Sequence, residues 1–193
     1  MPEGPEVETD KLRETIEEEH EPGFESFLKK IALTTALFAA LAAISALRAG
    51  ATVNEALMLR TEAARLQAEA SDQWSFYQAK GIKAAVDEAS QTSWLAMDKA
   101  PPAEYAERKA RYAAEQKEIE AKAREKEKER DAKIEESEHL LHRHHRFAYA
   151  VAILQVSIAL GAVAALTRSR PVWYGSLVLG VSGIALAAWT FLG

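Results

Sequence analysis

The chain has 193 residues, of which 48 % are hydrophobic and 27 % are charged, and its formal net charge is −5 at pH 7. It contains no cysteine, which excludes disulfides, thiolate zinc sites and cysteine nucleophiles. The acidic balance and the lack of a basic stripe exclude nucleic acid as an expected partner. The charges gather at 1–30 and 49–146, whereas 31–47 and 147–193 are almost wholly apolar. This segregation is typical of an all-α membrane protein with a polar appendage.

The first residues, MPEGPEVET, resemble the start of the formamidopyrimidine-DNA glycosylases. In that family the residue at the position of Pro2 supplies the nucleophilic amine, and the acid at the position of Glu3 handles protons. The resemblance ends after nine residues, and no four-cysteine zinc finger follows, so we reject a base-excision function. Residues 1–28 hold ten acids and two bases, and we expect an acidic N-terminal tail.

Residues 29–48 are expected to form the first of three transmembrane helices. The apolar run 31–47 has 17 residues, which rise about 26 Å as a helix. Lys29 and Lys30 can extend to the headgroups of a bilayer whose apolar core is about 30 Å thick. The preceding segment is long and acidic, and no small-residue cleavage site follows, so we interpret the run as an anchor and not as a secretory signal.

Residues 49–146 predict an extramembrane antiparallel helical hairpin with its tip at 99–103. Strong helix formers fill 49–99, and small or apolar residues recur there at steps of three and four: Ala56, Leu59, Ala63, Leu66, Ala70, Trp74, Tyr77, Gly81 and Ala85. Pro101 and Pro102 end this helix, and a second helical pattern runs from 103 to 146 into the next apolar segment. The two arms would reach about 76 Å and about 66 Å. We call this predicted coiled-coil-like hairpin the stalk.

The returning arm of the stalk has a weak hydrophobic seam. Heptad positions carry apolar or aromatic residues at first and lysines later: Tyr105, Tyr112, Ile119, Lys126 and Lys133. In 115–138, 17 of 24 residues are charged, and pairs such as Glu118–Lys122 and Glu125–Lys128 stabilise a helix by only about 0.2–0.5 kcal/mol each. Because such a hairpin is weakly stabilised alone, we expect the stalks of several subunits to bundle into a homo-oligomer.

The segment SDQWSFYQAKGIKAAV, residues 71–86, brings bulky side chains into an arm that is otherwise lined by alanine. Its distinctive residues are three aromatics and a glycine that allows close approach: Trp74, Phe76, Tyr77 and Gly81. We interpret them as a packing layer that sets the register of the stalk. A docking site for a partner protein or ligand, beside Lys80 and Lys83, is the alternative.

The segment HLLHRHHRF directly precedes the second apolar run. His139, His142 and His145 are three residues apart and share one helical face. Neutral imidazoles so grouped could hold Zn²⁺ or Cu²⁺, with Glu135 or Glu138 as an oxygen ligand, or could sense pH. We favour a third interpretation, in which histidines and arginines of this segment form an interfacial girdle against lipid phosphates.

Residues 147–167 and 172–193 predict the second and third transmembrane helices, joined by a short basic loop at 168–171. The apolar runs 31–47, 147–167 and 172–192 contain no Asp, Glu, Lys, Arg or His, which carriers and proton relays use at depth. Gln155 is the one amide there, and we expect it to hydrogen-bond to a neighbouring helix. Small residues at four-residue spacing, among them Gly161 and Gly183, predict close helix packing.

Charge near the spans predicts the orientation in the membrane. Arg168 and Arg170 favour a cytoplasmic loop by the positive-inside rule. The N-terminus, with Lys29 and Lys30, is then cytoplasmic as well, and the stalk and the C-terminus are periplasmic. Arg48, Arg143 and Arg146 favour the opposite orientation, but long polar segments are translocated largely regardless of their charge.

The chain resembles the bacterial family called domain of unknown function 4337 over about residues 25–192. The resemblance rests on SDQW…YQAKGIK, on the alanine-rich first span and on SEHLLHRHHRFAYAVAILQVSIALGAVAALTRSR with the final span. It implies a multi-pass protein of the bacterial inner membrane, and it implies no activity or site residues.

The sequence therefore predicts a non-enzymatic membrane protein without a cofactor. We expect an oligomeric scaffold or spacer, or an accessory subunit of a larger membrane complex, whose partners are lipids and protein subunits. One alternative is a transport or channel component formed by several subunits. The other is a metal- or pH-responsive sensor that uses His139, His142 and His145.

Overall fold

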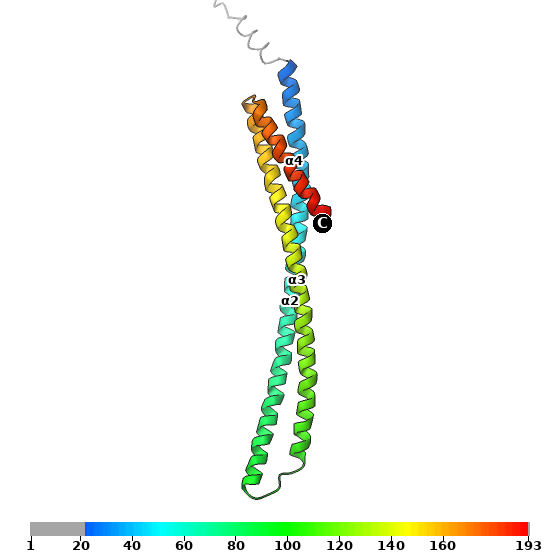
Figure 1. The fold of residues 1–193 in the computed structure, drawn as a ribbon, viewed down its shortest axis with the longest axis vertical. Helices are drawn as coiled ribbons and strands as arrows, with labels where there is room; N and C mark the ends of the chain where they lie inside the picture. Colours follow the sequence, from blue (N-terminus) through cyan, green and yellow to red (C-terminus); the bar gives the residue numbers. More distant parts are fainter. Residues whose placement is uncertain (1–21, 193) are drawn as a thin grey trace, which may run out of the picture. The chain divides into compact units, whose positions relative to one another are not determined.

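The computed structural model describes residues 22–192, which form three long helices (Figure 1). These are α2 (Pro22–Ala96), α3 (Glu104–Leu166) and α4 (Arg170–Leu192). No strand occurs among the described residues, so the prediction of an all-α chain is confirmed for them. The glycosylase-like start, with Pro2 and Glu3, and most of the predicted acidic tail lie outside the described residues.

The helices differ from the predicted elements mainly at their first residues. α2 begins at Pro22, so 22–28 of the predicted acidic tail are helical, and Glu25 suits the first turn of a helix. α3 carries the charged arm and the second apolar run in one uninterrupted helix, as predicted. α4 begins at Arg170, two residues before the predicted start, because Pro171 is tolerated in a first turn.

α2 ends at Ala96, ahead of the predicted tip, and the reason lies in its cap. Asp98 has φ 55°, in the left-handed region. The N–H of Lys99 donates to the carbonyl of Trp94 at 3.1 Å, and the N–H of Asp98 donates to that of Leu95 at 3.0 Å. This is a Schellman arrangement, which closes the helix before the two prolines are reached.

The described chain divides into two compact units, and each is described by itself. The apolar unit comprises 22–52 and 142–192, and the charged unit comprises 53–141. All three helices contain a stretch that is long and apolar enough to cross a membrane, by length and composition. The predicted spans 31–47, 147–167 and 172–192 all fall in the apolar unit.

In the charged unit, α2 and α3 lie side by side and run antiparallel (Figure 1). The hydroxyl of Ser137 donates to the carbonyl of Ala56 at 3.2 Å, and Nε of Arg108 donates to Asp87 at 3.0 Å, so residue numbers rise along α2 as they fall along α3. Alanines at the contact allow the helix axes to approach closely, and they are almost fully buried: Ala56, Ala63, Ala70 and Ala123.

The predicted seam of α2 is confirmed as far as Gly81 and is wrong at its last position. Residues of this seam from Ala56 to Gly81 are buried or half-buried, whereas Ala85 is exposed and Ala84 is half-buried in its place. The seam advances by three residues after Gly81 because a seven-residue step, from Tyr77 to Ala84, keeps it facing α3.

The weak seam predicted for α3 is also present. The five predicted positions are all half-buried: Tyr105, Tyr112, Ile119, Lys126 and Lys133. Lys122 pairs with Glu118 at 2.7 Å, as predicted. The predicted pair of Glu125 with Lys128 does not form among the described residues, where Lys126 pairs with Glu129 at 2.8 Å instead.

Candidate interaction surfaces

The aromatic segment 71–86 lies in the charged unit, and its side chains divide between two faces of α2. Trp74 and Tyr77 pack edge to face, with ring centroids 5.5 Å apart, and both are half-buried. A Cβ added at Gly81 would lie 3.0 Å from Nε2 of Gln116 on α3, so this position also faces the other helix. Phe76 is 59 % exposed and lies outside this layer.

Polar contacts fix the register of this layer against α3. The indole N–H of Trp74 donates to Oε1 of Glu127 at 2.9 Å. The side-chain amide of Gln116 donates to the backbone carbonyl of Tyr77 at 3.2 Å. A slip by one residue would leave these partly buried polar groups without partners, which costs about 1–3 kcal/mol for each.

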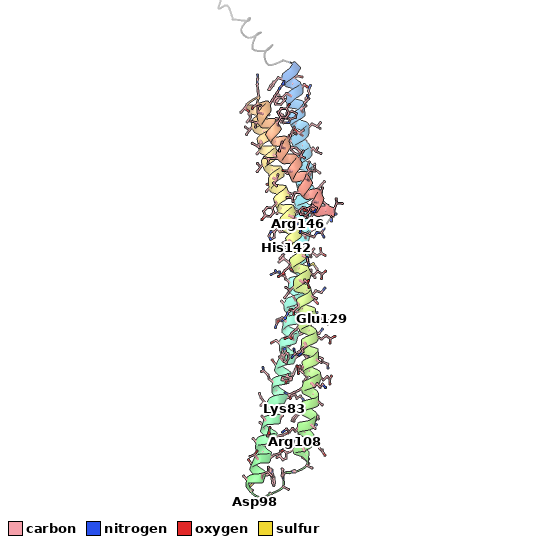
Figure 2. All side chains as sticks on the ribbon, viewed as in Figure 1. Lys83, Asp98, Arg108, Glu129, His142 and Arg146 are labelled. Carbon is pink, nitrogen blue, oxygen red and sulfur yellow. The ribbon has the colours of Figure 1, made fainter. Side chains whose placement is uncertain are left out.

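Ion pairs between the helices continue toward the turn at 97–103. Nζ of Lys80 lies 2.5 Å from Oε2 of Glu115, and this hydrogen-bonded lysine lowers the pKa of Glu115 below its usual value. Arg108, labelled in Figure 2, binds both carboxylate oxygens of Asp87, with Nε at 3.0 Å and Nη2 at 3.2 Å, and the contact raises the pKa of Arg108. Lys83 is exposed and forms no ion pair within 22–192.

The Asp87–Arg108 pair is a contact between the helices that was not predicted from the sequence. The two residues are 21 positions apart, and each is half-buried on the side facing the other helix. The midpoint of the pair lies between 97 and 98, at the cap of α2 and not at Pro101 and Pro102, so an alignment of the arms about the prolines would not have found it. Bidentate pairing adds geometric specificity to the contact.

In the apolar unit, three glycines mark places where helices touch. Each is buried, and an added Cβ would collide with or press on a side chain of another helix: Gly161 on Thr35, Gly180 on Phe38 and Gly183 on Leu154. Small residues at such contacts let helices approach closely. The spacing of small residues in the sequence predicted contacts at Gly161 and Gly183 but not at Gly180, which stands four residues after Ser176 in the same kind of spacing.

A pair of buried serines joins α3 to α4 in the apolar unit. Oγ of Ser157 donates to the carbonyl of Ser176 at 2.6 Å, and Oγ of Ser176 donates to the carbonyl of Ser157 at 2.8 Å. Gln155 is exposed and forms no side-chain hydrogen bond within 22–192, so its predicted interhelical bond is absent there. The shorter serine side chains supply that bond because they lie where the helices are in contact.

The basic loop after α3 is short and closely held. Arg168 has φ 54°, and the N–H of Ser169 donates to the carbonyl of Ala164 at 3.1 Å, so the loop caps α3 as a Schellman turn. The guanidinium of Arg168 lies 4.2 Å from the centroid of the Phe24 ring. This contact brings the loop against the start of α2.

The four basic residues named for topology lie in the same part of the apolar unit. Lys30 and Arg170 line one cavity of about 120 Å³ together with Trp173 and Tyr174. Arg170 and Arg168 line a neighbouring hollow. Lys29 pairs with Glu25 at 3.2 Å.

The predicted metal ligands His139, His142 and His145 are all exposed (His142 is labelled in Figure 2). Among the residues that the structure describes, no group of three His, Cys, Asp or Glu side chains is placed to hold a metal ion. His144, which was not among the predicted ligands, is half-buried, and its Nδ1 lies 2.9 Å from the carbonyl of Ala49. The metal and pH-sensing hypotheses therefore stay predictions.

A family model described as "Domain of unknown function (DUF4337)" matches residues 27–193. The resemblance seen in the sequence is thereby confirmed. No curated protein and no solved structure matches the chain significantly.

Proposed function

We propose a function from the residues themselves, because the chain belongs to the DUF4337 family, whose description states no activity. The protein is an integral membrane protein that acts as a non-enzymatic scaffold or spacer, or as an accessory subunit of a larger membrane complex. Its three apolar stretches cross a bacterial inner membrane. The residues between the first two spans form the stalk, a coiled-coil-like antiparallel hairpin that stands outside the lipid.

One observation carries this proposal: α2 and α3 each join an apolar stretch to a stretch with ten or more charged side chains within a single uninterrupted helix. A helix satisfies its own backbone hydrogen bonds and can therefore cross lipid. Each charged side chain at the centre of a bilayer costs about 2.5–3.5 kcal/mol on insertion scales. The charged arms must then lie in water while the apolar stretches of the same helices lie in lipid.

The interior of the apolar unit supports a scaffold over a carrier. Its predicted spans contain no Asp, Glu, Lys, Arg or His, and proton relays and carriers usually need such groups at depth. The hydroxyls of two buried serines, Ser157 and Ser176, each donate a hydrogen bond to the backbone carbonyl of the other. At Gly161, Gly180 and Gly183, side chains of a neighbouring helix lie where a Cβ would be. These contacts serve packing.

The basic residues support the proposed orientation. Arg168 and Arg170 occupy the short loop between the second and third spans, and Lys30 lines the same cavity as Arg170. By the positive-inside rule this group lies on the cytoplasmic side, where it also meets anionic lipid headgroups. The stalk and the C-terminus are then periplasmic.

Single cysteines, introduced into this cysteine-free chain, test the proposal in cells. A membrane-impermeant maleimide should label Ala114→Cys on the stalk in intact spheroplasts, and Thr167→Cys, directly before the basic loop, only after permeabilisation. Leu33→Cys is the control: Leu33 is 73 % exposed in the structure, yet lipid should protect it from the aqueous reagent. Labelling of Leu33→Cys as fast as Ala114→Cys would refute the membrane span, and the reverse labelling of Ala114→Cys and Thr167→Cys would refute the orientation.

A further inference from the structure

The outer face of α2 in the charged unit carries a second stripe of small and apolar residues. The stripe has alternating steps of three and four residues, and we define it as the outer stripe: Ala79, Ile82, Val86, Ala89, Ser93 and Ala96. All six are exposed, and Ile82 and Val86 are exposed by 65 % and 59 %. The seam toward α3 uses other residues, such as Tyr77 and Ala84, so the outer stripe has no partner within the charged unit.

The surroundings of the outer stripe are nearly free of charge. Of the fifteen exposed residues in 75–97, two are charged, Lys83 and Glu88, and Glu88 reaches to Lys109 of α3 at 3.5 Å. The facing part of α3 differs sharply. Of its twelve exposed residues in 104–122, seven are charged. At the same height, therefore, α3 carries an ordinary solvated surface and α2 does not.

The spacing identifies the kind of partner that would cover the outer stripe. Apolar residues at alternating steps of three and four match a second helix lying along the first, since that spacing keeps one seam facing a supercoiled neighbour. A flat surface or a small ligand would not require the pattern to continue from Ala79 to Ala96, over more than two heptads. Small side chains in the stripe allow the two axes to come close.

We propose that the outer stripe binds the outer stripe of a second copy of this chain, side by side and parallel. Self-pairing fits the charge, because the one unpaired charge beside the stripe is Lys83, labelled in Figure 2. In heptad terms Lys83 occupies an e position, which in a parallel pair faces the g position of the other chain, and that position is Gln78. Two copies therefore meet without placing like charges opposite each other.

The parallel direction rests on the proposed function, since two copies anchored in one membrane with one orientation must point the same way. Equal residue numbers then lie at equal heights. Val86 meets Val86 of the second copy, and Ile82 meets Ile82 one layer away. An antiparallel pair would bring equal residue numbers together at one height only.

Disulfide scanning of the full chain tests this pairing, in membranes and after purification alone. Single-cysteine variants Ala79→Cys, Ile82→Cys, Val86→Cys and Ala89→Cys are oxidised under mild conditions, because a disulfide forms only where Cα atoms come within about 7 Å. We expect each to yield a species of twice the 21.2 kDa of one chain, several-fold faster than Ala114→Cys, an exposed control at a similar height on α3. Efficient crosslinking that continues along the stripe identifies the parallel pair.

Other outcomes separate the pairing from the proposed function. Equal crosslinking of Ala114→Cys and the stripe variants, or none on the stripe, overturns the pairing and leaves the membrane topology untouched. Crosslinking confined to one layer overturns the parallel direction, and with it the common anchoring. Crosslinking in membranes to a product of any other mass, absent from the purified chain, means that a different partner covers the stripe, and this too overturns the proposal. As a second readout, Val86→Glu should lower the native mass, whereas Ala114→Glu should not.

Discussion

The contact of Gly180 with Phe38 gives the sharpest test of the packing of the apolar unit. A Cβ built at Gly180 would lie closer to three carbons of the Phe38 ring than real Cβ atoms lie to their neighbours, with Cε1 at 2.6 Å. The ring is only 3 % exposed and packs with Ala42 and Leu154, so it has little room to move aside. We expect Gly180→Ala to destabilise the association of α4 with α2.

The magnitude follows from a matched control in the same helix. Gly175 is exposed, and a Cβ there would meet no atom within 4 Å. Both Gly→Ala changes gain the same helix propensity, about 0.8–1 kcal/mol, so the difference between the two variants isolates the overpacking cost. That cost is typically about 1–3 kcal/mol, which corresponds to roughly a 5- to 160-fold difference in the unfolding equilibrium constant.

Reversible unfolding of the full chain in mixed detergent micelles, followed by circular dichroism and tryptophan fluorescence, measures this difference. Gly175→Ala should be as stable as the parent or slightly more stable, and Gly180→Ala should unfold at lower denaturing-detergent fraction. In a Phe38→Ala background the ring is gone, so Gly180→Ala should cost nothing further. Equal stability of Gly175→Ala and Gly180→Ala in the parent background would refute the close contact.

Three further outcomes are expected. Ser157→Ala and Ser176→Ala should each lower the unfolding free energy in micelles by about 0.6 kcal/mol, and at most about 1.7 kcal/mol, as for other interhelical hydrogen bonds in membranes. An unchanged unfolding free energy in both variants would contradict the serine hydrogen bonds between α3 and α4. The pKa of Glu115 is lowered chiefly by its hydrogen bond to Lys80. The stabilisation by Glu115 is therefore complete above its unfolded pKa, near 4.5, and is lost as the pH falls through the lower folded value. The free energy of unfolding, measured against pH, should decrease below about pH 4.5, and the decrease should be smaller in Lys80→Gln. Gly81→Leu should shift the register layer, since even a Cβ there would lie 3.0 Å from the facing glutamine amide; unchanged quenching of the neighbouring tryptophan would speak against this.

The sequence by itself determined the helical class and the order of the elements. Hydrophobic runs, helix formers and the prolines at 101 and 102 act locally, so composition and spacing along the chain suffice to predict them. The same local reasoning placed the seam of α2 as far as Gly81. It failed at Ala85, because the register beyond that point depends on where α3 lies and not on the residues of α2 alone.

The tertiary structure alone decided which side chains meet. In the sequence, Gly180 cannot be told from the other small residues of the third span; the structure shows that the ring of Phe38 packs against it. The sequence groups Phe76 with Trp74 and Tyr77, but its position on α2 leaves its side chain exposed. Gln155 carries the one amide side chain in the spans, yet Ser157 makes the interhelical bonds. In each case the outcome depends on rotation of a helix about its axis relative to a distant neighbour, and one residue's 100° turn separates a contact from an exposed surface.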